Sequence, residues 1–328
     1  MMKPSIVFHQ TPLEAGVGMR WWAETALDRT VLYARTPFSP VILDHLQRMQ
    51  VVIVGVGSGG SKIALDLAKA GVGGLRLVDP GLVQIHNTLR HLATLEDTGR
   101  PKVEVVAEQV LLHNPFVVVE TYAVDAFQVG GIISPRDIFA GVNLIIAATD
   151  KVSVQLQINT EAWHMGIPAV FGGCYESARG GEVLFTLPGE ATPCLACLRA
   201  GLKQPTIHGA FEYSAARSLE DYRGEPGLSA AVDLVTDVET QIALGILLRG
   251  TGSALADIIV PAYNFWLVGG ALAADYYLFK RPFHIFIQPL AGSRPDCDIC
   301  QTRQPPDLPA RDDLNLEDIP EEYRSLLD

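Results

Sequence analysis

The chain has 328 residues and a formal net charge of −12, with 25 Lys and Arg against 37 Asp and Glu. Its length fits one large domain or two small ones, and a hydrophobic fraction of 48% can supply a sizeable core. The acidic balance argues against nucleic acid and against an anionic membrane surface as partners, because both are bound through clustered Lys and Arg. Five cysteines and an N-terminus without a signal-peptide pattern predict a cytoplasmic protein with reduced thiols.

We expect residues 1–48 to form an N-terminal helical segment ahead of the main domain. Within this segment, the stretch from Trp21 to Leu27 resembles a helix start, and residues 41–49 predict a second helix. Residues 49–300 are expected to form the main domain. The acidic, proline-containing residues 301–328 predict a solvated, flexible tail.

The most informative stretch combines two buried strands, a glycine-rich turn and a helix. It consists of an apolar run at 51–54, the loop Gly55-Val56-Gly57-Ser58-Gly59-Gly60, a helical pattern at 61–70, a second apolar run at 75–78 and then Asp79. This order is the nucleotide-binding fingerprint of a Rossmann-like fold. Gly55 suits a tight turn, Gly57 lets a phosphate approach the backbone, and Gly60 lets the helix pack close to the strand. The N–H groups at the helix start then face the phosphates, and Asp79 can accept hydrogen bonds from a ribose.

The residues that follow Asp79 favour chemistry at phosphorus over hydride transfer. Asn87, Arg90 and then Lys102 place an amide and two cations shortly after the ribose acid. A nicotinamide enzyme has no need of them there, because the glycine loop already holds its diphosphate. An enzyme that acts at a phosphorus atom needs them to neutralise charge in the transition state. We therefore favour an ATP-using enzyme over a nicotinamide-dependent oxidoreductase.

This pattern resembles the ThiF/MoeB/HesA family, the adenylating enzymes related to ubiquitin-activating enzymes. The matching residues are the glycine loop, Val78-Asp79, Asn87-x-x-Arg90, Gly99-x-Pro101-Lys102, Ala148-Thr149-Asp150 and two Cys-x-x-Cys pairs. The resemblance implies ATP-dependent adenylation of the C-terminal glycine of a small β-grasp protein, either a sulfur carrier or a ubiquitin-like modifier. It also implies that Asp150 holds Mg²⁺ against the ATP phosphates, and that the protein is a homodimer.

Further apolar runs predict an α/β fold with a mostly parallel, Rossmann-like sheet and helices on both faces. Strands are expected at 117–120, 143–148 and 167–171, helices at 102–112 and 230–248, and the first strand of an antiparallel extension at 182–187.

Four of the five cysteines form two Cys-x-x-Cys pairs, Cys194 with Cys197 and Cys297 with Cys300. Four thiolates make a tetrahedral Zn²⁺ site that is coordinatively full and therefore structural. A single pair would also fit a redox motif, but two pairs together favour zinc. The metal would then close a loop of about 100 residues between the middle and the end of the chain.

The fifth cysteine, Cys174, leaves a second function open. Members of the resembled family often capture the acyl group on a cysteine in a crossover loop, but the corresponding residues 199–231 contain none. Cys174 is interpreted as a small buried core residue, or else as a site of thioester formation. The alternative function is accordingly a modifier-activating enzyme that passes its modifier from Cys174 to a conjugating enzyme. A non-catalytic nucleotide-binding scaffold is a third interpretation.

The resemblance also implies an N-terminal arginine that reaches into the ATP site of the partner subunit. Arg20, Arg29 and Arg35 are the candidates in this chain. For each of them, an ordinary surface arginine is the simpler interpretation.

Overall fold

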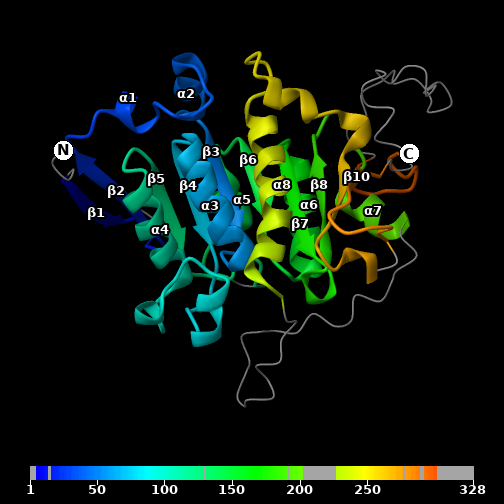
Figure 1. The fold of residues 1–328 in the computed structure, drawn as a ribbon, viewed down its shortest axis with the longest axis horizontal. Coiled ribbons are helices and arrows are strands. Elements are labelled where there is room, and N and C mark those ends of the chain that lie inside the picture. Colours follow the sequence, from blue (N-terminus) through cyan, green and yellow to red (C-terminus); the bar gives the residue numbers. More distant parts are fainter. Residues whose placement is uncertain are drawn as a thin grey trace.

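The protein is built on one mixed β-sheet. A computed structural model describes residues 5–13, 16–128, 131–190, 192–201, 227–275, 278–288 and 292–300. Across these residues the sheet has ten strands in the order β1-β2-β5-β4-β3-β6-β7-β8-β9-β10 (Figure 1). The expected acidic tail at 301–328 and most of the expected crossover loop, at 202–226, lie outside the described residues.

The centre of the sheet is parallel, as the sequence predicts. Its strands are β3 (Gln50–Val54), β4 (Gly74–Val78), β5 (Val118–Tyr122), β6 (Leu144–Ala147) and β7 (Ala169–Cys174). The strand order reverses between β3 and β6, because β4 and β5 continue on one side of β3 while β6 and β7 continue on the other. In an open parallel sheet, ligands bind beyond the carboxyl ends of the strands at such a reversal.

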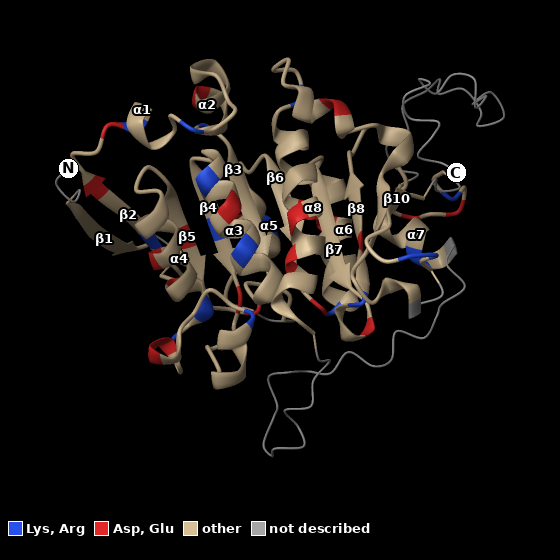
Figure 2. Ribbon diagram, viewed as in Figure 1, with Lys and Arg blue, Asp and Glu red and all other residues tan. Residues whose placement is uncertain are grey.

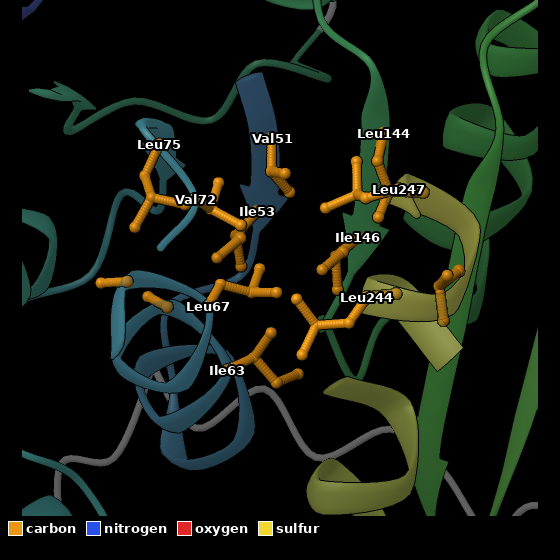
Figure 3. Packing of buried hydrophobic residues seen from close by; sticks show 14 of the residues in the cluster. Val51, Ile53, Ile63, Leu67, Val72, Leu75, Leu144, Ile146, Leu244 and Leu247 are labelled. Carbon is orange, nitrogen blue, oxygen red and sulfur yellow. The ribbon is translucent and has the colours of Figure 1, made fainter. Parts of the chain in front are cut away.

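Helices cover both faces of this parallel core. One face carries α3 (Ser58–Ala70), α4 (Lys102–His113) and α8 (Ser229–Leu247), and the other carries α5 (Pro135–Phe139), α6 (Val152–Met165) and α7 (Leu195–Gly201). Alternate residues of each strand point to opposite faces, so every central strand contributes to two apolar cores. Figure 3 shows the first core, where the side chains of β3 and β6 meet those of α3 and α8.

The expected antiparallel extension is also present. It consists of β8 (Gly180–Thr186), β9 (Phe265–Gly269) and β10 (Ile285–Ile287). Short 3-10 helices lie at Ile85–Leu89 (η1), Leu95–Asp97 (η2), Glu176–Ala178 (η3), Ala254–Ile258 (η5), Pro261–Tyr263 (η6) and Ala273–Asp275 (η7). None of the helices in the described ranges is long and apolar enough to cross a membrane.

The N-terminal region is only partly helical, and the helix expected from Trp21 to Leu27 is wrong. Residues 21–25 belong to β2 (Met19–Thr25), which pairs with β1 (Ile6–Pro12) and with β5. The side chain of Trp21 is buried and donates a hydrogen bond of 3.0 Å to Thr121 Oγ1. Aromatic and β-branched residues fit such a pleated, half-buried surface, and cross-strand pairing outweighs a weak helical pattern.

The second expected helix, over 41–49, is confirmed as α2 (Pro40–Leu46). Ser39 caps it by accepting a hydrogen bond from the N–H of Ile42, and Pro40 occupies its first position. A one-turn helix, α1 (Arg29–Leu32), precedes it.

Candidate functional site

The glycine loop follows β3 at the reversal point of the sheet, and backbone crowding requires two of its glycines. Gly55 has a φ of +90°, and a Cβ placed on it would lie 2.6 Å from the carbonyl oxygen of Ala148 at the end of β6. A Cβ on Gly60 would collide with the carbonyl oxygen of Gly55. Gly57 differs, because no atom of the described residues outside its chain neighbours lies within 4 Å of the position of its Cβ. The outer side of the loop is therefore open to a ligand.

Helix α3 begins three residues earlier than the sequence predicts, at Ser58. Gly57 is its N-cap and supplies no side-chain acceptor for the first N–H groups. These groups carry the positive end of the helix dipole and suit a phosphate. Thr236 of α8 packs against Gly59, where its Cγ2 would be 2.8 Å from an added Cβ, so α8 supports the first turn from the side.

Asp79 holds the glycine loop in addition to facing the site. Its Oδ2 accepts a hydrogen bond of 2.7 Å from the N–H of Val56, and its Oδ1 accepts one of 2.7 Å from the N–H of Gly81. Each carboxylate oxygen retains acceptor capacity for a ribose hydroxyl. The sequence indicated a ribose ligand at this position, but the bond to the loop depends on the tertiary fold and was not anticipated.

Asn87 and Arg90 lie on an excursion of the chain between β4 and α4. Its two ends are joined by a bridge between Leu82 and Pro101 and by a hydrogen bond from the N–H of Val83 to the carbonyl of Arg100. Asn87 Oδ1 accepts a hydrogen bond of 2.9 Å from the N–H of Gln84 and so caps η1. The amide NH₂ is the part of Asn87 that can donate to a phosphate.

Lys102 begins α4 and lies beside Asp79. A Cβ placed on Gly81 would be 2.8 Å from Asp79 Oδ1 and 3.1 Å from Lys102 Nζ. Lys102 forms no ion pair within 4 Å with any of the residues that the structure describes, so its charge is available to a ligand. The charged residues around this edge are of both signs (Figure 2).

The guanidinium of Arg90 lies on the other side of the excursion, toward the start of α8. Its Nη1 would be 3.5 Å from a Cβ on Gly227. His86 lies within the field of both cations. Burial lowers the pKa of His86, and the charges of Arg90 and Lys102 lower it further. The charges of Arg90 and Lys102 thus both act on the region around His86.

Asp150 follows β6, across the reversal point from the glycine loop. Its surface reaches solvent, yet the surrounding protein raises the pKa of its carboxyl; Lys151 and Lys102 oppose this rise and Asp79 adds to it. A carboxylate that is costly to ionise gains from a nearby cation, and oxygen ligands suit Mg²⁺. Asp150 therefore fits the magnesium role that the resemblance implies.

Cys174 ends β7 at this same edge. The residue has an exposed surface, but the packed chain around the sulfur raises the pKa of the thiol to about 12, with a contribution from Glu239 and an opposing one from Arg90. Its thiol is therefore neutral at pH 7. The interpretation of Cys174 as a buried core residue is wrong, because its side chain lies at the surface.

Glu239 is a buried acid that the sequence analysis missed. It is 2% exposed, its Oε1 has no hydrogen-bond partner among the described residues, and burial raises its pKa to about 8. Its carboxyl group occupies the space that a side chain on Gly172 of β7 would need. Its position between Val235 and Ile242, which face the core at helical spacing, was the available indication.

The four paired cysteines form one buried cluster, as predicted. Their sulfur atoms all lie within 4.8 Å of one another, with separations of 3.9 Å from Cys194 to Cys197, 3.7 Å from Cys194 to Cys297 and 3.6 Å from Cys197 to Cys300. Tetrahedral zinc with Zn–S bonds of about 2.3 Å requires sulfur separations of about 3.8 Å. The donor set and its spacing therefore fit a structural Zn²⁺.

The cysteine cluster is linked to the sheet through α7. Arg199 at the end of this helix forms an ion pair of 2.5 Å with Glu182 of β8, and Glu182 also accepts a hydrogen bond of 2.8 Å from the hydroxyl of Tyr175. Glu182 is buried, so this pairing compensates a charge that would otherwise be costly. A metal bound at Cys194 and Cys197 would fix α7, which carries Arg199, the ion-pair partner of Glu182.

Two of the three N-terminal arginines have partners within the chain. Arg20 forms an ion pair of 2.6 Å with Glu120, and Arg29 forms one of 3.0 Å with Asp44. The implied role of Arg20 or Arg29 in a second subunit stays a prediction. A role for Arg35 stays a prediction.

Together, the open parallel sheet, the glycine loop and the surrounding charges define a Rossmann-type nucleotide-binding protein with an added four-cysteine module. The model of the ThiF family matches residues 31–250. The chain belongs to the ThiF family, in agreement with the resemblance seen in its motifs.

Two relatives match parts of the chain at 33–34% identity. A sulfur carrier protein adenylyltransferase of Thermus thermophilus is 34% identical over 188 residues, which cover 55% of this chain and 66% of that protein. Ubiquitin-like modifier-activating enzyme 5 of Drosophila grimshawi is 33% identical over 162 residues, or 47% of this chain and 40% of that protein. The chain thus spans less than two thirds of either relative.

Solved structures show the same fold at low identity. MccB of E. coli, solved with ATP, superposes with a TM-score of 0.59 at 17% identity, covering 79% of this chain and 69% of that chain. PaaA superposes with a TM-score of 0.56 at 14% identity, covering 86% of this chain and 98% of that chain.

Proposed function

We propose that the protein is an ATP-dependent adenylyltransferase that activates the C-terminal glycine carboxylate of a small ubiquitin-like or sulfur-carrier protein. The observation that carries this proposal is the position of Lys102 beside Asp79, close enough for its charge to act on Asp150 after β6. The ammonium of Lys102, at the start of α4 and without an ion pair among the described residues, is suited to a polyphosphate. The names of the Thermus and Drosophila relatives support the substrate class, and MccB with ATP supports the nucleotide.

The chemistry follows from charge. A C-terminal carboxylate has a pKa of about 3.5 and is ionised near neutral pH, so it needs no general base. It attacks the α-phosphorus of ATP, a new C–O–P linkage forms, and pyrophosphate leaves with the bond electrons. The enzyme has to bring two anions together and spread the charge that develops between them.

The residues of this chain would divide that work. The first N–H groups of α3 bind phosphate oxygens, and Asp79 binds the ribose while it fixes the loop. Lys102 and Arg90 neutralise the charge, and Asn87 orients a phosphate through its NH₂ group. Bound Mg²⁺, held by Asp150, would supply further charge neutralisation. Zn²⁺ on the four cysteines would have a structural role.

The site electrostatics favour adenylation without a thioester step. Thioester formation through Cys174 needs a thiolate, whereas the thiol has its pKa raised to about 12. We propose that the reaction of this chain ends at the acyl-adenylate, in keeping with the lack of cysteine in residues 199–231. We also propose that residues 49–300 form the adenylating unit and that the active protein is a homodimer.

The proposal is tested by mass spectrometry of candidate carriers. The full-length protein is incubated with ATP, Mg²⁺ and small β-grasp proteins encoded near its gene, and each carrier is measured intact. We expect one carrier to gain the mass of an AMP moiety, and a carrier without its terminal glycine to gain nothing. Unchanged mass for every carrier, under conditions that preserve acyl-adenylates, would count against the proposed activity.

A further inference from the structure

We propose that His91 is a positioning residue that ties the Arg90-bearing excursion to the glycine loop and does so only as a neutral imidazole. This inference rests on the proposed function, because it names a group that aligns two parts of the same site. His91 was not among the residues that the sequence analysis selected.

Both backbone polar groups of Val56, in the glycine loop, are hydrogen-bonded to side chains outside the loop. Its N–H donates to Asp79 Oδ2 at 2.7 Å, and its carbonyl oxygen lies 2.8 Å from His91 Nε2. The His91 side chain is 8% exposed, so these bonds lie away from solvent. Val56 precedes the N–H groups that face a phosphate. It is therefore fixed between Asp79, which follows β4, and His91 on the excursion.

The other ring nitrogen settles which tautomer is present. His91 Nδ1 accepts a hydrogen bond of 2.9 Å from the N–H of Ala93, so it carries no proton. Nε2 must then carry the proton and donate it to the carbonyl of Val56. A doubly protonated ring would place an N–H of Nδ1 against the N–H of Ala93. Protonation therefore removes one bond and replaces it with a repulsive contact.

The position of His91 in the chain gives this contact its consequence. His91 directly follows Arg90, and the N–H groups of both residues donate to the carbonyl of Asn87. Loss of the bond to Val56 therefore removes a contact that fixes the residue next to Arg90 relative to the glycine loop. Small displacements of catalytic groups cost large factors in rate.

The charged groups around His91 favour the neutral form on balance. Burial is the largest influence and lowers the pKa of His91, and Lys102 on α4 lowers it further. The bond to Val56, Asp79 after β4, and Asp97 on the excursion oppose this. The result is a pKa below the ordinary value of about 6.5. The contact of His91 with Val56 and Ala93 is therefore kept at neutral pH and lost in mild acid.

Three variants test the role. In His91→Gln the amide NH₂ can donate to Val56 and the amide oxygen can accept from Ala93, without a titrating group. His91→Leu removes both bonds and keeps the bulk, and His113→Gln alters an exposed histidine at the end of α4. Carrier-dependent pyrophosphate exchange is measured from pH 5 to 8, with ATP binding measured in parallel by calorimetry and folding by thermal melting.

We expect His113→Gln to match the wild type and His91→Gln to keep its rate near pH 7.5 within about threefold while losing the acid limb that His91 causes. His91→Leu should lose about tenfold or more in kcat/KM for ATP near pH 7.5, and this difference from the wild type should shrink toward pH 5. A His91→Gln enzyme with an unchanged acid limb would overturn the inference, as would a folded His91→Leu enzyme with wild-type kcat/KM.

Calorimetry separates this inference from the proposed function. If the wild type binds ATP but exchanges no pyrophosphate with any carrier, adenylation fails, and the pH dependence of ATP binding in wild type and His91→Gln still decides the role of His91. If ATP does not bind at any pH, both proposals fail. If the wild type is active and His91→Leu is equally active, only the role of His91 fails.

Discussion

Lys102 Nζ and Asp79 Oδ1 both lie close to Gly81, 3.1 Å and 2.8 Å from the position that a Cβ on this glycine would occupy. The two charges are neighbours without an ion pair within 4 Å among the described contacts. Asp79 is occupied by the backbone of the glycine loop, which leaves the ammonium free to bind an incoming anion. This arrangement makes Lys102 the most direct target for mutation.

Lys102→Met should slow adenylation strongly without unfolding the protein. Removing one preorganised positive charge from a phosphoryl-transfer site costs on the order of a hundredfold in kcat. Lys69→Met, at the far end of α3 and 48% exposed, is the matched control and should change kcat by less than twofold. Comparable losses in the two variants would contradict a specific role for Lys102.

The two glycines at positions 57 and 60 should respond differently to alanine. Gly60→Ala places a methyl group against the carbonyl of Gly55, so we expect the melting temperature to fall sharply. In Gly57→Ala the methyl group meets no atom in the part of the chain that the structure describes and φ is −82°, so stability should be retained. The same methyl group projects where a phosphate would approach, and the Kd for ATP should rise about tenfold. Calorimetry and thermal melting of both variants check this, and unchanged ATP affinity in Gly57→Ala would place the phosphates elsewhere.

Glu239→Gln should stabilise the protein at alkaline pH. The folded pKa of Glu239, about 8, is above its unfolded value of 4.5, so the stability associated with its protonated form is complete below pH 4.5. That stability falls as the pH rises from 4.5 to about 8, by about 1.4 kcal/mol for each pH unit, and the loss is complete above pH 8. We expect the variant to match the wild type near pH 4.5 and to melt at a higher temperature at pH 8. The exposed Glu96→Gln should show no such divergence. If the difference in melting temperature between Glu239→Gln and the wild type is the same at both pH values, the ionised carboxyl of Glu239 has a stabilising partner.

Removing the metal should destabilise the β8 side of the sheet. Cys197→Ser should lower zinc content, measured by elemental analysis, and should lower the melting temperature by roughly 2–4 °C for each kcal/mol lost. Cys174→Ser is the control, because Cys174 is outside the cluster, and it should keep full zinc content and pyrophosphate exchange. Full zinc content in Cys197→Ser would show that the cluster does not bind the metal as a four-thiolate set.

Local patterns in the sequence predicted those parts of the fold that depend on local structure. The strand at 51–54, the glycine loop and the acid at 79 occur as predicted, because turn geometry and burial on both faces constrain these residues directly. Asn87, Arg90, Lys102 and Asp150 follow from family resemblance, and their catalytic roles stay predictions. The spacing of the cysteine pairs was sufficient to predict the cluster.

The elements that were missed depend on partners distant in sequence. Trp21 lies in a strand because it pairs with Val119 of β5 and donates a hydrogen bond to Thr121, about a hundred residues away in sequence. His91 contacts Val56, and Glu239 lies against Gly172, so neither role can be read from its own segment. The role of a buried polar residue depends on the element that packs against it, and that element can be distant in sequence.

The most direct test of adenylation is exchange of labelled pyrophosphate into ATP. The wild-type protein is mixed with ATP, Mg²⁺ and a β-grasp carrier that ends in a glycine carboxylate, and then with the same carrier amidated at its C-terminus. We predict exchange with the free carboxylate, none with the amide, and loss of exchange in Lys102→Met. Equal exchange with both carriers, or none with any free carboxylate, would contradict attack of a carrier carboxylate on the α-phosphorus.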